Sequence, residues 1–160
     1  MAQLEIPPKG TRGSRFPKWL WRLIAPLAAG QVGRYRKNAT AEPKIFNGFP
    51  TVLVTTVGAK TGKEHTHVLG GFLDKDNSWL IVASKNGAAT HPHWFINLAK
   101  NPDKVWLEVG NQKFHVRPDE LKGAEYEDAY ARVVASAPGY AKYRKVTDRE
   151  IPVIRLTPIS

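Results

Sequence analysis

The chain has 160 residues, 42% of them hydrophobic, and this combination indicates one folded domain rather than a disordered polypeptide. It contains no cysteine, which excludes disulfides, thiol nucleophiles and cysteine-based metal sites, and which suits a reducing compartment. The formal net charge of +10 is compatible with three anionic partners: nucleic acid, a membrane surface or an acidic cofactor.

Residues 1–45 are predicted to form a basic leader around an amphipathic helix. Apolar residues recur at helical spacing in this segment, at Phe16, Trp19, Leu20, Leu23, Ile24 and Leu27. Ser14 is predicted to cap this helix, Pro17 to occupy its first turn, and Pro26 and Gly30 to limit its end. The apolar run is too short to span a bilayer, which needs about 20 residues.

Two interpretations of this helix remain open. We expect its apolar face to pack on the rest of the domain, as amphipathic helices usually do. The alternative is that Trp19 and its apolar neighbours lie in a membrane interface, with Arg15, Lys18 and Arg22 near the lipid headgroups.

Residues 46–160 are predicted to form the main domain, which is mostly β. Short apolar runs rich in β-branched residues predict strands at 52–57, 65–72, 79–83, 105–109, 113–117 and 151–156. Gly110 and Asn111 predict a hairpin turn. Helices are predicted at 92–100, opened by Pro92, and at 120–135. Short, evenly spaced strands favour a small antiparallel barrel with helices on its surface.

Two glycine-containing basic loops follow predicted strands, one at 58–62 with Lys60 and one at 84–87 with Lys85. Backbone amides in such loops can converge on an oxyanion, although a single lysine in a turn is more often simply solvated. The spacing matches neither a Walker loop nor a Rossmann fingerprint. Trp94 and Asn97 share a helix face, where an indole and a carboxamide can support a flat ring and bind its edge. A buried tryptophan beside a helix-terminal asparagine is the alternative.

The remaining candidate residues are histidines and tyrosines. His65 and His67 point to the same side of a strand, but no cysteine or carboxylate set accompanies them, so we predict no metal site. Tyr140 and Tyr143 share a face if their segment is helical. Near a cofactor, phenols can orient a carbonyl group or donate a proton, whereas on a surface helix they merely pack.

Taken in order, these motifs resemble the deazaflavin-dependent nitroreductase family. The resemblance covers residues 50–158 and is carried by 53–62 (LVTTVGAKTG), 82–87 (VASKNG), 91–98 (HPHWFINL), 101–102 (NP), 138–143 and 147–152 (TDREIP). It implies an α+β fold that is mainly β, a split β-barrel, which binds coenzyme F420 through that cofactor's flat ring, phosphate and polyglutamate tail. FMN is the alternative cofactor.

The resemblance also implies site residues. Cofactor-binding positions fall on Lys60, Thr61, Gly62, Ala83, Ser84, Lys85, Trp94 and Asn97, and the predicted site also includes His65, Thr66, His67, Val82 and His93. Substrate-facing positions fall on Ser84, Tyr140 and Tyr143, which are our catalytic candidates for orienting the acceptor or supplying its proton.

This sequence departs from the family pattern in both parts of the site. Ala59 and His65 stand where the family usually has arginines, and Val68 where it has proline, which should weaken the grip on an acidic tail near neutral pH. Ala137 stands where some members have tyrosine, which leaves the acceptor open.

We therefore predict a reductase that transfers hydride from reduced coenzyme F420 to a quinone, an α,β-unsaturated carbonyl or a nitro compound. A deazaflavin-binding protein without turnover, and a basic membrane-surface or nucleic-acid module, are the alternatives. The predicted partner is a small-molecule electron acceptor and no specific nucleic acid. We expect a monomer or homodimer in the cytoplasm, with peripheral contact to the inner face of the cell membrane through the N-terminal helix as an open alternative.

Overall fold

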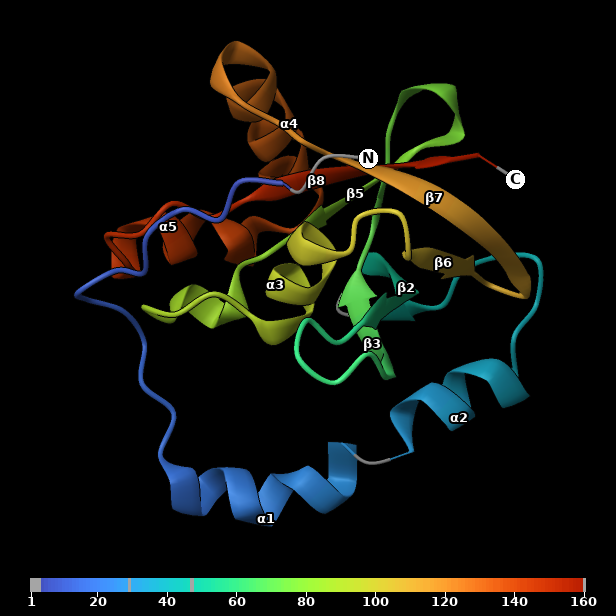
Figure 1. Cartoon of the computed structure of the whole chain (residues 1–160), viewed down its shortest axis with the longest axis horizontal. Coiled ribbons are helices and arrows are strands. Elements are labelled where there is room, and N and C mark those ends of the chain that lie inside the picture. The colour runs from blue at the N-terminus through green and yellow to red at the C-terminus, as the bar shows by residue number, and fades with distance from the viewer. Residues whose placement is uncertain (1–3, 29, 47, 160) are drawn as a thin grey trace.

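A curled antiparallel sheet forms the body of the protein (Figure 1). The computed structural model describes residues 4–28, 30–46 and 48–159. The strands are β1 (Ile45–Phe46), β2 (Phe49–Val57), β3 (Glu64–Gly70), β4 (Phe72–Leu73), β5 (Trp79–Val82), β6 (Trp106–Val109), β7 (Gln112–Glu120) and β8 (Val153–Pro158). Their order in the sheet is β1-β2-β6-β7-β8-β5-β4, and β3 pairs with β2. The predicted split barrel, mainly β with few helices, is confirmed as a curled half-barrel.

The helices lie around this sheet. They are α1 (Lys18–Ala28), α2 (Gln31–Lys37), α3 (His93–Lys100), α4 (Gly123–Ser136) and α5 (Tyr143–Val146), with 3-10 turns at Lys75–Asn77, Lys85–Gly87 and Pro138–Lys142. Pro92 has extended backbone angles and precedes the first residue of α3, as its lack of an N–H favours. The predicted hairpin turn is confirmed, because Val109 pairs with Gln112 and Gly110 has a φ of 58°.

The sheet curls because the chain bends between β3 and β4. Gly71 separates these two strands, and its N–H donates to the carbonyl of Pro50 on β2. A Cβ at Gly71 would lie 2.7 Å from a side-chain carbon of Val52, so a larger residue does not fit there. The single strand predicted at 65–72 is therefore wrong at its end. The bend takes the chain from β2's edge to β4, at the far end of the strand order.

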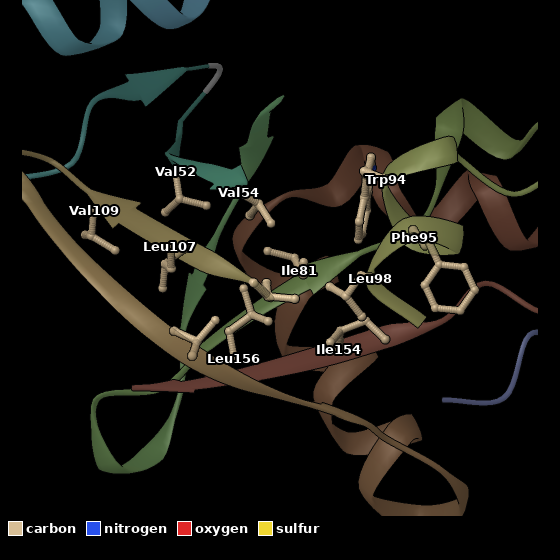
Figure 2. Packing of buried hydrophobic residues seen from close by; sticks show 13 residues of the cluster. Val52, Val54, Ile81, Trp94, Phe95, Leu98, Leu107, Val109, Ile154 and Leu156 are labelled. Atoms are coloured by element: carbon tan, nitrogen blue, oxygen red, sulfur yellow. The ribbon is translucent and has the colours of Figure 1, made fainter. Parts of the chain in front are cut away.

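The barrel interior holds the main hydrophobic core (Figure 2). Alternate residues of β6 face inward, so Leu107 and Val109 are buried while Trp106 and Glu108 are not fully covered. Phe95 and Leu98 of α3 complete this core from one side. A second cluster under α4 includes Tyr130. Full burial of each large apolar side chain stabilises the fold by roughly 1.5–3 kcal/mol.

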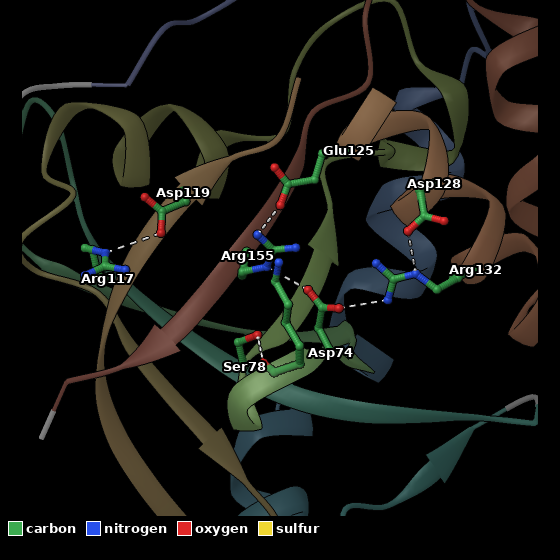
Figure 3. Close-up of polar contacts among 9 residues, drawn as sticks. Asp74, Ser78, Arg117, Asp119, Glu125, Asp128, Arg132 and Arg155 are labelled. Atoms are coloured by element: carbon green, nitrogen blue, oxygen red, sulfur yellow. Dashed lines mark hydrogen bonds and ion pairs between the residues drawn. The ribbon is translucent and has the colours of Figure 1, made fainter. Parts of the chain in front are cut away.

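An ion-pair network joins α4 to β8 outside the barrel (Figure 3). The nearly buried carboxylate of Asp74 lies 2.7 Å from Nε of Arg155 and 2.8 Å from Nη1 of Arg132. Burial alone would raise the pKa of Asp74, but the hydrogen bonds from the two guanidinium groups outweigh it and hold the pKa below its usual value. This network fixes α4 on the sheet, away from the cavity described below.

The N-terminal helix differs from the prediction. It begins at Lys18, and Ser14 does not cap it, because Ser14 donates its hydroxyl proton to the carbonyl of Asn86 instead. Pro26 lies inside the helix rather than at its end. The expected packing on the domain is also wrong, because Trp19 and Leu23 are 64% and 65% exposed and α1 lies apart from the sheet (Figure 1). The Leu27 side chain lies outside the described part of the structure.

The segments before and after α1 do pack on the barrel. Before it, Leu4 donates its N–H to the carbonyl of Ala99 in α3, and Gly10 donates to Ala89. After it, α2 contacts β3, and β1 pairs with β2. The hydroxyl of Tyr35 donates to the carbonyl of Thr51 and accepts from the N–H of Gly110. The boundary at residues 45 and 46 stays a prediction.

Candidate active site

A cavity of about 680 Å³ opens beside the barrel, where five segments of the chain meet. Its lining residues include Gln31, Arg34, Tyr35, Lys44, Ile45, Phe46, Phe49, Val68, Gly70, Ser84, Asn86, Tyr140 and Tyr143. The volume is typical of small-molecule sites, and the lining is mainly apolar and aromatic with a few polar groups. Among the described residues that line it, none is acidic. The cavity therefore suits a flat, partly apolar ligand that is neutral or anionic.

All three predicted catalytic residues line this cavity. The rings of Tyr140 and Tyr143 meet edge to face, with their centroids 5.2 Å apart. Phe49 and Phe72 also pack against Tyr140. Burial, with a smaller effect of the neighbouring Tyr143, raises the pKa of Tyr140 to about 12. Tyr140 therefore keeps its proton across the physiological range and can act as a hydrogen-bond donor.

Ser84 is presented by a turn with an uncommon backbone. The turn follows β5, and both Lys85 and Asn86 adopt left-handed backbone angles with φ of 43° and 55°. Such angles cost about 1–3 kcal/mol per residue when other contacts must hold them, and they concentrate at ligand sites. The hydroxyl of Tyr143 lies 3.3 Å from Oδ1 of Asn86. The ammonium of Lys85 is 2.9 Å from the hydroxyl of Thr90, which orients it.

The first basic loop is built around glycine. Gly62 has a φ of 70°, and its N–H donates to the carbonyl of Gly58. Oδ1 of Asn97 on α3 accepts the N–H of Ala59 at 3.0 Å, so this carboxamide oxygen secures the loop rather than facing a ligand ring. The loop carries Lys60 and Thr61 at an exposed position outside the cavity lining.

Trp94 is a buried residue of the barrel core, as in the second of its two interpretations. It is only 5% exposed and belongs to the barrel core, where its ring meets Phe95 edge to face (Figure 2). Neither Trp94 nor Asn97 is among the residues that line the cavity. Val82 and Ala83 are buried at the end of β5, directly before Ser84.

The histidines form a second group beside the first loop. Burial lowers the pKa of His67, and the nearby imidazoles of His65 and His93 lower it further. Among the described residues, Nδ1 of His67 is buried without a hydrogen-bond partner. The hydroxyl of Thr66 pairs with that of Thr55 across the strands at 2.7 Å. No group of three or more metal-ligating side chains occurs in residues 4–28, 30–46 and 48–159.

The sequence interpretation missed the outer wall of the cavity. Tyr35 and Lys44 come from the predicted leader, Phe46 is the first residue of the predicted main domain, and Phe49 begins β2. The pair Phe46 and Phe49, on either side of Gly48, is the one local signal that would have extended the site, because two aromatic residues flank a turn there. Tyr35 lies among basic residues and carries no comparable signal.

Comparison with known proteins shows the family to which the chain belongs. A family model described as F420H(2)-dependent quinone reductase matches residues 28–158. The chain belongs to this family. The predicted membership of the F420-dependent reductases is thereby confirmed.

This member of the quinone reductase family is similar to other proteins over most of their length. The chain is 38% identical over 143 residues to an F420H(2)-dependent quinone reductase of Mycobacterium tuberculosis (strain ATCC 25618 / H37Rv), covering 86% of this chain and 89% of the relative. A solved structure of an F420-H2 dependent reductase, FDR-A, is 37% identical with a TM-score of 0.60, over 67% of this chain and 93% of that one. Another solved chain, described as a domain-swapped dimer, is 31% identical with a TM-score of 0.63, over 82% and 98% of the two chains.

Proposed function

We propose that this protein is an oxidoreductase that passes hydride from reduced coenzyme F420 to a quinone-type acceptor. The observation that carries the proposal is the convergence of Ser84, Tyr140 and Tyr143 on one aromatic cavity, in a chain of the quinone reductase family. The cavity volume fits a flat ring, and the described residues that line the cavity include no acidic side chain that would repel an anionic ligand.

The protein supplies binding and orientation, and the cofactor when bound supplies the hydride. Lys60 and the amides of its loop would hold the acidic part of the cofactor, and Lys85 would add positive charge. The buried Nδ1 of His67, which lacks a partner among the described residues, offers one further polar contact. These groups fit a ligand with a ring and an anionic tail.

The cavity residues would act on the acceptor. Phe49 and Tyr140 shield the space from water, which favours a productive encounter of the two reactants. The hydroxyl of Ser84 donates a hydrogen bond to the acceptor oxygen as negative charge develops on it, and the hydroxyl of Tyr143 does the same by turning away from Oδ1 of Asn86. Tyr140 remains protonated, so it can orient the same oxygen or supply its proton.

A titration distinguishes the proposed cofactor from FMN. Coenzyme F420 and FMN are each titrated into the protein, and binding is followed by their fluorescence. We then measure oxidation of reduced coenzyme F420 by a quinone, an α,β-unsaturated ketone and a nitroaromatic compound. We expect F420 to bind in preference to FMN and the quinone to be reduced fastest. Binding without turnover of any acceptor would favour the deazaflavin-binding alternative, and a preference for FMN would contradict the cofactor assignment.

We also propose that α1 holds the enzyme at the inner, cytoplasmic face of the cell membrane. The supporting observation is the exposure of Trp19 and Leu23 on a helix that also carries Lys18 and Arg22, with the exposed Phe16 shortly before its first residue. No described helix is long and apolar enough to cross a bilayer. An amphipathic helix with cations on its polar side lies in the interface instead, next to the hydrocarbon layer in which apolar quinones dissolve.

Vesicle sedimentation tests this contact. We expect the protein to sediment with vesicles that contain anionic lipid, and a Trp19→Ser, Leu23→Ser double variant to remain in solution. Equal sedimentation of both proteins would contradict the proposal. Binding to duplex DNA that falls steeply with salt, and that the double variant retains, would favour the basic nucleic-acid module instead.

A further inference from the structure

Arg149 is a buried cation that the proposed chemistry does not use. It lies between α5 and β8, is 6% exposed, and is not among the residues that line the cavity. Its guanidinium has five N–H donors, and the structure gives it five acceptors. They are the carbonyls of Ala88 (from Nε, 2.6 Å), Glu150 (from Nη1, 3.0 Å), Ala83 (from Nη2, 3.1 Å) and Ser84 (from Nη2, 2.9 Å), and Nδ1 of His91 (from Nη1, 3.4 Å).

Backbone carbonyls and an imidazole, rather than a carboxylate, make up this acceptor set. A buried charge is costly unless it is paired or fully hydrogen-bonded, and here hydrogen bonding alone satisfies it. The planar guanidinium can meet several acceptors at fixed angles, which a lysine ammonium with three donors cannot do. The arrangement is therefore specific for the shape of arginine and not only for its charge.

Three of the five acceptors belong to one short segment. Ala83 and Ser84 precede the left-handed residues Lys85 and Asn86, and Ala88 follows them. The guanidinium thus bridges both ends of the turn that presents Ser84 to the cavity. A turn in which Lys85, Asn86 and Gly87 are all left-handed persists only when surrounding contacts hold it, and Arg149 supplies such contacts to the carbonyls at both ends of the turn.

His91 extends the same network to the N-terminal segment. Because Nδ1 of His91 accepts from Arg149, its proton lies on Nε2, which donates to the carbonyl of Pro7 at 2.7 Å. Burial lowers the pKa of His91, and the carbonyl of Pro7 partly opposes this shift. Ser14 meets the outer side of the turn, where its N–H donates to the carbonyl of Gly87. The turn is therefore fixed by the buried guanidinium of Arg149 and, on the opposite side, by hydrogen bonds with the N-terminal residues 7–14.

We propose that Arg149 is a positioning residue for the reaction, whose guanidinium holds the Ser84–Asn86 turn in the conformation that faces Ser84 into the cavity. It acts through backbone carbonyls and touches neither cofactor nor acceptor. This inference rests on the proposed function for its effect on turnover, but its structural part is independent of any ligand.

The structural part is tested on the ligand-free protein by hydrogen exchange. Arg149→Lys keeps the charge and loses the planar fork. Arg155→Lys is the matched control, because Arg155 is a partly buried arginine that pairs with carboxylates instead of carbonyls. We expect the amides of Gly87 and Ala88 to exchange about 10-fold to 100-fold faster in Arg149→Lys, while the amide of Val54 in β2 is unchanged. Exchange equal to that of the natural protein would overturn the inference.

The effect of Arg149 on turnover is tested by measuring kcat and KM for quinone reduction. We expect Arg149→Lys to lower kcat for quinone reduction by up to about 100-fold with a smaller change in KM, because a misplaced turn costs orientation more than binding. Guanidinium ion added to Arg149→Ala should restore part of the rate and none in Arg155→Ala. Unchanged kcat in Arg149→Lys, or rescue of both alanine variants alike, would contradict positioning. Failure of the natural protein itself to reduce a quinone would instead overturn the proposed function and leave the exchange result standing.

Discussion

At the scale of single residues, the two tyrosines of the cavity differ in their surroundings. Tyr140 is enclosed by Phe49 and Phe72, and burial raises its pKa to about 12. The hydroxyl of Tyr143 donates to Oδ1 of Asn86, so Tyr143 contacts the turn that carries Ser84. The resemblance to the F420 family indicated these residues, but not which of them is enclosed, because enclosure depends on the distant residues of β2 and β4.

Removal of either phenol oxygen should slow the acceptor step. We expect Tyr140→Phe and Tyr143→Phe each to lower kcat for quinone reduction by about 10-fold to 100-fold, since each removes one donor to the developing negative charge. The dissociation constant of coenzyme F420, measured by fluorescence, should change little. Turnover of the double variant at the natural rate would remove both residues from the mechanism.

Gly70 offers a test of how closely Tyr140 must be placed. A Cβ at this position would lie 2.8 Å from the Tyr140 hydroxyl oxygen and 2.9 Å from the ring of Phe49. Gly70→Ala should displace Tyr140 and lower kcat by about 10-fold, following the sensitivity of catalysis to small misplacements.

The matched control for this change is Gly139→Ala, because a Cβ added at Gly139 meets no atom within 4 Å apart from its own neighbours in the chain. Steady-state kinetics of both variants, with crystal structures of each, checks the expectation. Equal rates for the two alanine variants would contradict a strict placement of Tyr140.

At the scale of elements, periodicity predicts the barrel strands and the helices α3 and α4 well, because a buried face imposes a regular pattern. It does not predict the break between β3 and β4. That break depends on the close approach of Gly71 to Val52, a contact between residues far apart in the sequence. It also misses α2, which is short and mostly polar and has only Tyr35 as a buried residue.

Tyr35 attaches α2 to the barrel and so supports the outer wall of the cavity. Tyr35→Phe leaves the carbonyl of Thr51 and the N–H of Gly110 without this partner in a buried place. We expect the free energy of unfolding to fall by about 1–3 kcal/mol. The KM for the acceptor should rise because the wall loosens. Denaturant unfolding and steady-state kinetics measure the two effects, and an unchanged KM would show that this wall does not contact the acceptor.

At the scale of the whole molecule, the described residues of the cavity wall all follow α1 in the sequence, and the apolar face of α1 itself is exposed at Trp19 and Leu23. The sequence shows that face plainly, but it cannot show whether the face meets protein or lipid. Composition likewise shows the net charge of +10 without showing that no acidic residue is among the described residues that line the cavity.

Alkaline unfolding is a whole-molecule consequence of the buried tyrosines. Burial raises the pKa of Tyr140 and of Tyr126 to about 12, above the ordinary value of 10.0. The unfolded chain therefore loses these protons first, so stability is intact below pH 10 and falls as the pH rises toward 12. The loss is of the order of 2 kcal/mol per tyrosine at pH 12. Tyr140→Phe should reduce the slope of stability against pH in this window, and an unchanged slope measured by urea unfolding would contradict the assignment.

The central claim is that the cavity brings reduced coenzyme F420 and a quinone together for hydride transfer. A single-turnover experiment tests it most directly: the enzyme with reduced coenzyme F420 is mixed rapidly with a quinone, and the return of oxidised-cofactor absorbance is recorded. We predict fast, saturable oxidation that slows at least about 10-fold in the Tyr140→Phe, Tyr143→Phe double variant. Oxidation no faster than in the absence of protein would contradict the account.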